Sequence, residues 1–280
     1  MNKHHITPLR SGIRLVAIDL DGTLLDSRKE LPIGAIELFT SARRAGLLIS
    51  IITGRNACSV FNLAKTLHLS GPHASSGGSM IFGNGGRPIY FRSSLSGEDT
   101  RQVIAISRRW NLTIFIQSAS RILMENGDHF LSYLTRNFNP CPPQPCKDIL
   151  AELNFKPLKF TLYGDHQALS NARMDLEECH GCFHLTTAGE EDIEITPSGV
   201  NKGSALQEIS RITGVLTQNI MVIGDSPNDL SMFSKVDLAV AVANASPEVK
   251  QAAKMIAPSN NEAGVLWAIQ NLALSPLPIQ

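Results

Sequence analysis

LVAIDLDGTLL, residues 15 to 25, decides the fold because it joins a short apolar run directly to two carboxylates, a glycine and a hydroxyl. The run from Leu15 to Ile18 is typical of a strand buried on both faces of a parallel sheet. Asp19 and Asp21 follow at its carboxyl end, and residues two apart on an extended chain point to the same side. We therefore expect both carboxylates to face one small volume beyond the sheet edge, where open α/β sheets bind their ligands.

Two carboxylates in one small volume repel each other and raise each other's pKa unless a cation lies between them. Magnesium and similar hard cations bind one or two carboxylates and keep open positions for phosphate oxygens. An aspartate neutralised in this way can act as a nucleophile, and a neighbour two residues on can serve as acid and base. The alternative interpretation is a strand that ends in a polar turn, because Asp and Gly are common turn residues.

Two later strand ends carry polar groups of the same kind. The apolar run Leu47–Ile52 leads into Thr53-Gly54-Arg55, where a hydroxyl beside a free backbone amide suits a phosphate oxygen. Alone this signal is weak, since Thr-Gly often opens a helix for reasons of turn geometry. The run Asn219–Ile223 leads into Gly224-Asp225-Ser226-Pro227-Asn228-Asp229, which again places carboxylates at the end of a predicted buried strand.

The charge balance across these strand ends predicts a metal ion. Lys202, which opens a helical segment, is a single nearby cation among four carboxylates: Asp19, Asp21, Asp225 and Asp229. This set is too acidic to bind a phosphate by itself. A divalent cation and Lys202 together neutralise the nucleophile and the transferring phosphoryl group, whose transition state spreads charge over its oxygens.

Strand, loop and helix alternate along residues 1–82 and again along residues 195–280, which predicts an α/β fold whose core is a Rossmann-like, doubly wound parallel sheet. One expected helix has an apolar face made of Ile33, Ile36, Leu38 and Phe39. Residues 83–194 instead interleave short strand-like pieces with helical ones, so we expect an inserted α+β domain there. Asn84-Gly85 is expected to form a hairpin turn near the junction.

The composition excludes several classes of protein. With 43% hydrophobic and 18% charged residues the chain is not disordered, and its formal net charge of zero argues against general binding to nucleic acid or anionic membranes. No apolar run approaches the roughly 20 residues of a membrane span. The opening MNKHHITPLRSG lacks the apolar core of a signal peptide, and five cysteines suit a reducing compartment better than a disulfide framework. We expect a cytoplasmic protein.

The cysteines of the insert allow two further hypotheses. A four-thiolate zinc site or a redox-active CxxC could be built from Cys141, Cys146, Cys179 and Cys182. We favour unrelated cysteines in two loops, because the first pair has irregular spacing and no flanking knuckle glycines. Cys58, at the start of a helical segment, is expected to be a small core residue and not a nucleophile.

Taken together, these motifs resemble those of the haloacid dehalogenase superfamily. Four ordered motifs match: Asp19-Leu20-Asp21-Gly22-Thr23-Leu24, Thr53-Gly54-Arg55, Lys202-Gly203 and Gly224-Asp225-Ser226-Pro227-Asn228-Asp229. The insert between the second and third motifs resembles that of Cof-type phosphatases, which carry a C2-type cap, and the similarity continues through Val240–Gly264. The resemblance implies a Rossmann-like core with a cap that closes over it.

The resemblance also implies roles for single residues. Asp19 would be the nucleophile that forms an aspartyl-phosphate, and Asp21 the acid and then the base. The substrate and its phosphoryl group would be held by Thr53, Gly54, Lys202 and Asn228. Magnesium would be bound by Asp19, the backbone carbonyl of Asp21, Asp225, and Asp229 or Asn228. Members usually have Asn-Gly where this chain has Gly77-Gly78, so a substrate or cap contact of that Asn is not carried over.

The function predicted is magnesium-dependent hydrolysis of a small phosphorylated metabolite, a sugar phosphate or a phosphorylated cofactor. The alternatives are a phosphosugar mutase of the same superfamily and a catalytically weak regulatory or binding protein that keeps the fold. Asp19 and Asp21 argue against the binding protein, which needs no acid two residues from a nucleophile. Specificity is expected to lie in the insert, where Glu190, Glu191 and Asp192 could select cationic or hydroxyl-rich substrates or, as we favour, form a solvated acidic face.

Overall fold

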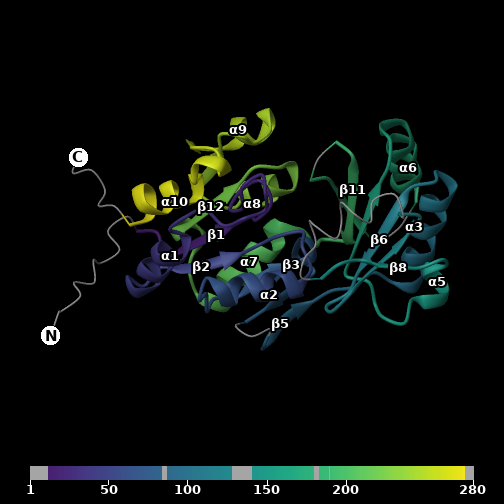
Figure 1. Cartoon of the computed structure of the whole chain (residues 1–280), viewed down its shortest axis with the longest axis horizontal. Helices are drawn as coiled ribbons and strands as arrows, with labels where there is room; N and C mark the ends of the chain where they lie inside the picture. The colour runs from purple at the N-terminus through teal and green to yellow at the C-terminus, as the bar shows by residue number, and fades with distance from the viewer. Residues whose placement is uncertain (1–11, 84–86, 128–140, 180–182, 189, 275–280) are drawn as a thin grey trace.

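The computed structural model describes residues 12–83, 87–127, 141–179, 183–188 and 190–274, and it consists of two parts that lie side by side (Figure 1). The first part, which we call the core, contains a five-stranded parallel sheet. Its strand order is β14 (Met255–Ala257), β13 (Leu238–Val242), β12 (Ile220–Gly224), β1 (Leu15–Ile18) and β2 (Leu48–Ile51). Strand β1 is central, and the expected Rossmann-like sheet is confirmed.

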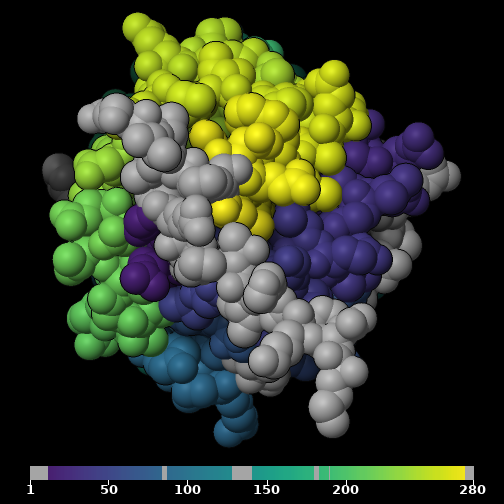
Figure 2. Space-filling model, turned by 90° about the vertical axis from the view of Figure 1, so that its left-hand side faces the viewer, coloured from purple at the N-terminus to yellow at the C-terminus, as the bar shows by residue number. Residues whose placement is uncertain are grey.

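Helices follow the strands of the core sheet, and several of them connect parallel neighbours, as that arrangement requires. The main ones are α1 (Ala35–Arg44), α2 (Ala57–Thr66), α7 (Lys202–Thr213), α8 (Leu230–Phe233), α9 (Pro247–Ala252) and α10 (Gly264–Ala268). Figure 2 shows the end of the core farthest from the second part, where the C-terminal segment (yellow) lies beside the segment of α1 (purple-blue). Residues near the beginning and the end of the described chain thus pack into the same hydrophobic cluster.

The apolar face predicted for α1 is partly wrong. Ile33 is 100% exposed and Ile36 is exposed, whereas Phe39 is buried. Helix α1 begins only at Ala35, after Gly34 in the left-handed conformation, so Ile33 lies before the helix. The buried stripe therefore consists of Ala35, Phe39 and Ala42, spaced by four and three residues.

The second part, which we call the cap, is a six-stranded sheet with helices on one face. Its strand order is β10 (Phe183–Thr186), β11 (Asp192–Pro197), β9 (Lys159–Tyr163), β6 (Thr113–Gln117), β7 (Ile122–Glu125) and β8 (Gln144–Pro145). The helices α3 (Gly97–Arg109), α5 (Ile149–Glu152) and α6 (His166–Glu178) cover the face turned away from the core (Figure 1). The expected α+β insert is confirmed as a fold class.

Alternation along the cap strands separates its two faces. One alternating set of residues on the cap strands, which includes Ile116, Phe160 and Ile195, forms the hydrophobic cluster under the helices. Their neighbours in sequence, among them Gln117, Lys159 and Glu194, point to the opposite face, toward the core. The cap therefore turns a polar surface to the strand ends of the core sheet.

A small antiparallel sheet lies where the chain first leaves the core. It contains β3 (His73–Ser75), β4 (Met80–Phe82) and β5 (Ile89–Arg92). The hairpin predicted at Asn84-Gly85 falls outside the described residues. Strand β11 runs across the second expected domain limit, between residues 194 and 195, and both limits stay predictions. Within the described residues, no helix is long and apolar enough to cross a membrane.

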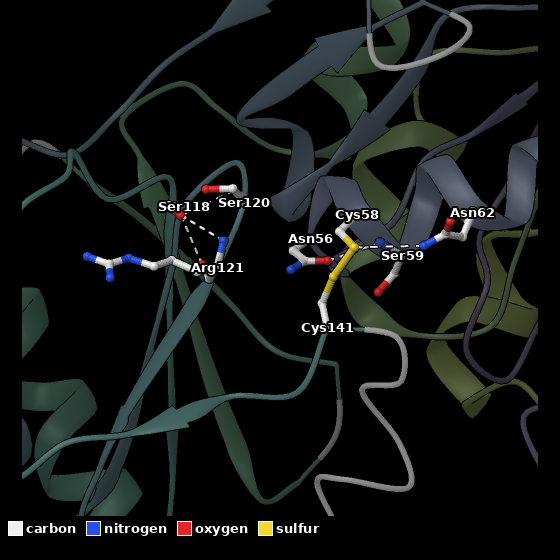
Figure 3. Close-up of a disulfide and its surroundings, with 8 residues drawn as sticks. All are labelled: Asn56, Cys58, Ser59, Asn62, Ser118, Ser120, Arg121 and Cys141. Carbon is white, nitrogen blue, oxygen red and sulfur yellow. Dashed lines mark hydrogen bonds between the residues drawn. A yellow bond between two sulfur atoms is a disulfide. The ribbon is translucent and has the colours of Figure 1, made fainter.

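A disulfide joins the core to the cap, contrary to the expectation that the cysteines are thiols (Figure 3). Cys58 lies in the first turn of α2, and Cys141 lies on the segment that leads into β8. Their Cα atoms are 6.4 Å apart, although 83 residues separate them in sequence. Cys58 is half-buried and cross-linked, so the prediction of a small core residue is wrong.

The disulfide also removes Cys141 from the four-thiolate zinc hypothesis. Cys146 and Cys179 are free thiols, and Cys182 lies outside the described residues. The four-thiolate site is therefore contradicted by the structure, and whether Cys179 and Cys182 form a redox-active CxxC stays untested.

Candidate active site

Three strand ends and one helix bring the predicted residues together. Asp19 follows β1 and is buried, and the loop after β12 supplies Asp229. Lys202, at the start of α7, donates hydrogen bonds to Asp19 Oδ1 at 2.8 Å and to Asp229 Oδ1 at 2.7 Å. Helix α7 begins there because the Asn201 side chain accepts a hydrogen bond from the Ser204 N–H, which caps its N-terminus. One buried lysine thus bridges the first and fourth motifs.

The carboxylates of Asp19, Asp225 and Asp229 form a cluster in which one oxygen of each lies within 4.8 Å of the others. Burial raises the pKa of Asp19 well above its ordinary value, although Lys202 lowers it. Burial and the neighbouring Asp229 raise the pKa of Asp225 to about 6. Burial and repulsion between the carboxylates thus both disfavour their ionised forms, which a bound cation would stabilise. Three clustered carboxylate oxygens fit a hard divalent cation such as Mg²⁺.

The turn after β1 supports this cluster. Thr23 Oγ1 donates a hydrogen bond of 2.5 Å to Asp225 Oδ1. Gly22 has φ +80°, and a Cβ at this position would lie 2.5 Å from Asp225 Oδ2. Only glycine lets the backbone carry both the left-handed turn and the close approach of that carboxylate.

Asp229 mainly organises the loop after β12. Its Oδ2 accepts hydrogen bonds from the backbone N–H groups of Asp225 at 3.0 Å and Ser226 at 3.1 Å. Since its Oδ1 accepts from Lys202, donors already contact both oxygens of this carboxylate. The Asn228 side chain accepts from Ser226 Oγ and donates to Glu194 Oε2 at 3.2 Å. Asp229 therefore contacts Lys202 and belongs to the carboxylate cluster, whereas the Asn228 amide contacts Ser226 and Glu194.

Asp21 is not part of the carboxylate cluster and pairs with two cations. Arg55 donates to both of its oxygens, at 2.7 and 2.6 Å, and Lys29 Nζ lies 2.9 Å from Oδ1. Although burial raises the pKa of Asp21, the hydrogen bonds and charges of Arg55 and Lys29 outweigh it and lower the pKa to about 2. Asp21 is therefore ionised in this structure.

The second motif lies on the opposite side of Asp19 from the loop after β12. Thr53 is buried, and its Oγ1 accepts a hydrogen bond from the Arg55 N–H at 3.2 Å. The carbonyl of Gly54 accepts hydrogen bonds of 3.3 Å from two cap side chains, those of Gln117 and Lys159. The turn predicted to hold phosphate is thus also a point where the cap contacts the core.

A cavity of about 580 Å³ lies between the core motifs and the polar face of the cap. It is lined by Asp19, Asp21, Thr53 and Lys202 from the core, and by Thr161 and Tyr163 among others from the cap. This volume suits a small organic phosphate.

The acidic run of the cap also borders this cavity. Glu190 and Glu191 are exposed, as expected for a solvated face. Asp192 is buried, and its carboxylate accepts hydrogen bonds from Thr187 Oγ1 and the Ala188 N–H, which close the turn before β11. The prediction of a solvated side chain is wrong for Asp192.

Gly77 shows what the departure from the usual Asn permits. It has φ +67°, and a Cβ there would lie 3.0 Å from Thr196 Cγ2 of β11. Asn tolerates the left-handed conformation, so the tighter constraint is the approach of Thr196. A glycine lets β11 pack closely against this turn.

Sequence reasoning missed several residues that the structure brings to the site. Arg55 and Thr23 stand inside the quoted motifs, but nothing local showed that they contact Asp21 and Asp225. The remaining missed residues are Lys29 and the cap side chains Gln117, Lys159 and Glu194. The alternation in KFTLY (159–163) and DIEITP (192–197) was a usable signal, because it puts the polar residues of both strands on one face.

Comparisons with known proteins agree with this geometry. The family model described as haloacid dehalogenase-like hydrolase matches residues 16–269. The chain is 29% identical over 286 residues to the 5-amino-6-(5-phospho-D-ribitylamino)uracil phosphatase YwtE of Bacillus subtilis, covering 93% of this chain and 98% of the relative. It is 28% identical over 251 residues to the HMP-PP phosphatase of Yersinia pestis, covering 85% and 86%.

Solved structures show the same fold. A haloacid dehalogenase-like hydrolase from Bacteroides thetaiotaomicron superimposes with a TM-score of 0.83 at 25% identity, covering 93% of this chain and 99% of that one. A second such hydrolase, from B. subtilis, gives a TM-score of 0.84 at 21% identity, with coverage of 93% and 100%. Both parts of the molecule, core and cap, are therefore shared with these proteins.

Proposed function

Because the chain belongs to the haloacid dehalogenase-like hydrolases, as the resemblance to Cof-type members predicted, we propose that it is a magnesium-dependent phosphatase. Its substrate is a small phosphorylated metabolite, a sugar phosphate or a phosphorylated cofactor. The observation that carries the proposal is the buried triad of Asp19, Lys202 and Asp229 beside Asp225, of which Asp19 and Lys202 line a cavity of about 580 Å³. Relatives named as phosphatases of small metabolites support the reaction class.

Asp19 is the proposed nucleophile. Its carboxylate oxygen forms a bond to phosphorus while the ester P–O bond breaks, which leaves an aspartyl-phosphate and an alcohol. Water then attacks the phosphorus and releases inorganic phosphate and the free carboxylate. Lys202, held against Asp19 Oδ1, lowers the charge that opposes approach of the phosphoryl group. Thr53 and the Gly54 turn bind the phosphoryl oxygens from the other side, and Asn228 contributes from the loop after β12.

Asp21 is the proposed acid and base. It donates a proton to the leaving oxygen in the first half-reaction and takes one from water in the second. In this structure it is ionised, which is the state that the base step requires. Arg55 and Lys29 can pair with the substrate's phosphate instead of Asp21, and this exchange would raise the pKa of Asp21 and allow it to carry the proton.

Asp19, Asp225, Asp229 and the backbone carbonyl of Asp21 are the groups that would hold Mg²⁺. When bound, the cation supplies charge neutralisation and polarises a phosphoryl oxygen. The raised pKa values of Asp19 and Asp225 support this assignment, because a cation would stabilise the ionised form of both. The cytoplasmic location expected from the sequence stays a prediction.

The experiment that tests the proposal is phosphate release from a panel of phosphorylated sugars, cofactors and nucleotides, with Mg²⁺ or with a chelator. We expect turnover that needs Mg²⁺ and is lost in Asp19→Asn but kept in Asp237→Asn, a matched change at an exposed carboxylate. Equal activity of Asp19→Asn and the native chain would refute the mechanism. Activation by a sugar bisphosphate with an isomerised phosphate as product would instead identify a mutase, and absence of turnover on every substrate would favour a binding protein.

A further inference from the structure

A buried ion pair lies on the polar face of the cap, and the mechanism above does not use it. Lys159 is the first residue of β9 and Glu194 the third of β11, on adjacent antiparallel strands. Lys159 Nζ pairs with Glu194 Oε1, and the two side chains are 3% and 6% exposed. Both charges are therefore removed from water although they line the edge of the active-site cavity.

The pair contacts both phosphate-site loops of the core. Lys159 Nζ donates to the carbonyl of Gly54 at 3.3 Å, beside the Gln117 Nε2 donor at the same distance. Glu194 Oε2 accepts from Asn228 Nδ2 at 3.2 Å. Through this pair, the cap connects the turn of the second motif to the loop of the fourth.

A side chain at Gly54 would require the ion pair to move. An added Cβ would lie 2.8 Å from Lys159 Nζ and 2.9 Å from Glu194 Oε1. The glycine of the second motif thus leaves room for the ion pair of the cap. The close approach of the ion pair, and not the backbone conformation, explains why glycine stands here, since the φ of Gly54 is not in the left-handed region.

A buried ion pair is a poor way to stabilise a fold, because the desolvation of two charges offsets most of their attraction. A pair of apolar side chains of similar size would stabilise the cap at least as well. The position of these charges, against Gly54 and Asn228, therefore indicates a role in the site.

We propose that Lys159 and Glu194 are positioning residues for phosphoryl transfer, which hold the Gly54 turn and Asn228 in place when the cap lies against the core. The inference rests on the proposed function. Neither residue takes part in a bond change: Lys159 acts through the Gly54 carbonyl, and Glu194 acts through the Asn228 amide and by keeping Lys159 in place. The phosphate site is complete only while the cap supplies these contacts.

A charge-balanced double variant separates positioning from simple stabilisation. Lys159→Met alone leaves a buried carboxylate unpaired, so both stability and kcat should fall. Lys159→Met with Glu194→Gln removes both charges, and we expect the unfolding midpoint to recover while kcat stays about tenfold or more below native. The matched control is Arg108→Met with Glu125→Gln, a cap pair outside the cavity lining, which should leave kcat and KM unchanged.

A native kcat in the charge-balanced variant would overturn the proposal, because a structural role alone predicts that activity returns with stability. Gln117→Met is a second test, which changes no buried charge. It removes the other side-chain donor to the Gly54 carbonyl. We expect its kcat to fall several-fold with a modest drop in the unfolding midpoint, because the change also removes the acceptor of the buried Ser76 hydroxyl. Native kinetics in this variant would also count against the proposal. Absence of Asp19-dependent turnover in the native chain would refute the proposed function and this inference with it, whereas native kinetics in the cap variants of an active enzyme would refute this inference alone.

Discussion

Substitution of Gly22 by alanine is the sharpest test of how the metal-site turn is built. Gly22 has φ +80°, where an L-residue with a Cβ costs about 1–2 kcal/mol. The added Cβ would also lie 2.5 Å from Asp225 Oδ2, so this carboxylate has to move. Asp225 is tied to Thr23 on the same turn and belongs to the acidic cluster, so its movement disturbs the proposed cation site directly.

Gly34→Ala is the matched control for this substitution. Gly34 has φ +84°, nearly the same backbone conformation, but an added Cβ would find nothing within 4 Å. Both variants should lose about 1–2 kcal/mol of unfolding free energy from backbone strain, measured by urea titration. Only Gly22→Ala should lose activity, by about a hundredfold in kcat/KM, because about 1 Å of misplacement in a catalytic site has that effect.

The dependence on Mg²⁺ concentration gives the diagnostic readout. Displacement of Asp225 should raise the Mg²⁺ concentration needed for half-maximal activity in Gly22→Ala and leave it unchanged in Gly34→Ala. Native kcat/KM and native Mg²⁺ dependence in a folded Gly22→Ala protein would refute the reasoning. Equal activity losses in both variants would show that strain, and not contact with Asp225, is responsible.

Three further predictions concern buried groups. Burial lowers the pKa of His73 to about 4 from an ordinary value of 6.5, so the unfolded chain takes up the proton first as pH falls. The unfolding free energy should reach its full value above pH 6.5 and be about 2 kcal/mol lower at pH 5. Urea titrations at several pH values should show that this free energy changes less with pH in His73→Asn. Reduction of the Cys58–Cys141 disulfide opens a loop of 83 residues and gives the unfolded chain more conformational freedom, so the unfolding free energy should drop by about 4–5 kcal/mol. Cys58→Ser should lose the same amount. Lys202→Met leaves two buried carboxylates without their cation, so we expect a loss of about 3–5 kcal/mol that Mg²⁺ partly restores, as measured by the thermal midpoint with and without the metal.

The core and its cluster of carboxylates could be predicted because their signals are local. Each buried strand is a continuous apolar run, and the polar residues that follow it lie at one edge of a parallel sheet by the rules of that architecture. Asp19 and Asp225 each follow such a run, so both were expected at the same edge of the sheet, and the structure adds that β1 and β12 are adjacent strands.

The cap contacts could not be predicted, because they depend on which strands become neighbours. Alternation shows that Lys159 and Glu194 each point to one face of a strand, but only the order β11-β9-β6 puts them beside each other and over Gly54. The pairing of Cys58 with Cys141 has no local signal at all, since it forms between separate parts of the fold. The exposure of Ile33 depends on where α1 begins, which is set by the left-handed Gly34.

The disulfide adds a third covalent connection between the core and the cap. Without it, only the outgoing and the returning backbone segments would connect the cap covalently to the core. With it, the chain between Cys58 and Cys141 becomes a closed ring that includes the first crossing into the cap. A protease that cuts once anywhere inside this ring leaves a single covalent molecule, and the two fragments separate on a gel only after reduction. The cap is therefore held to the core at three points, one of them removable by a reductant.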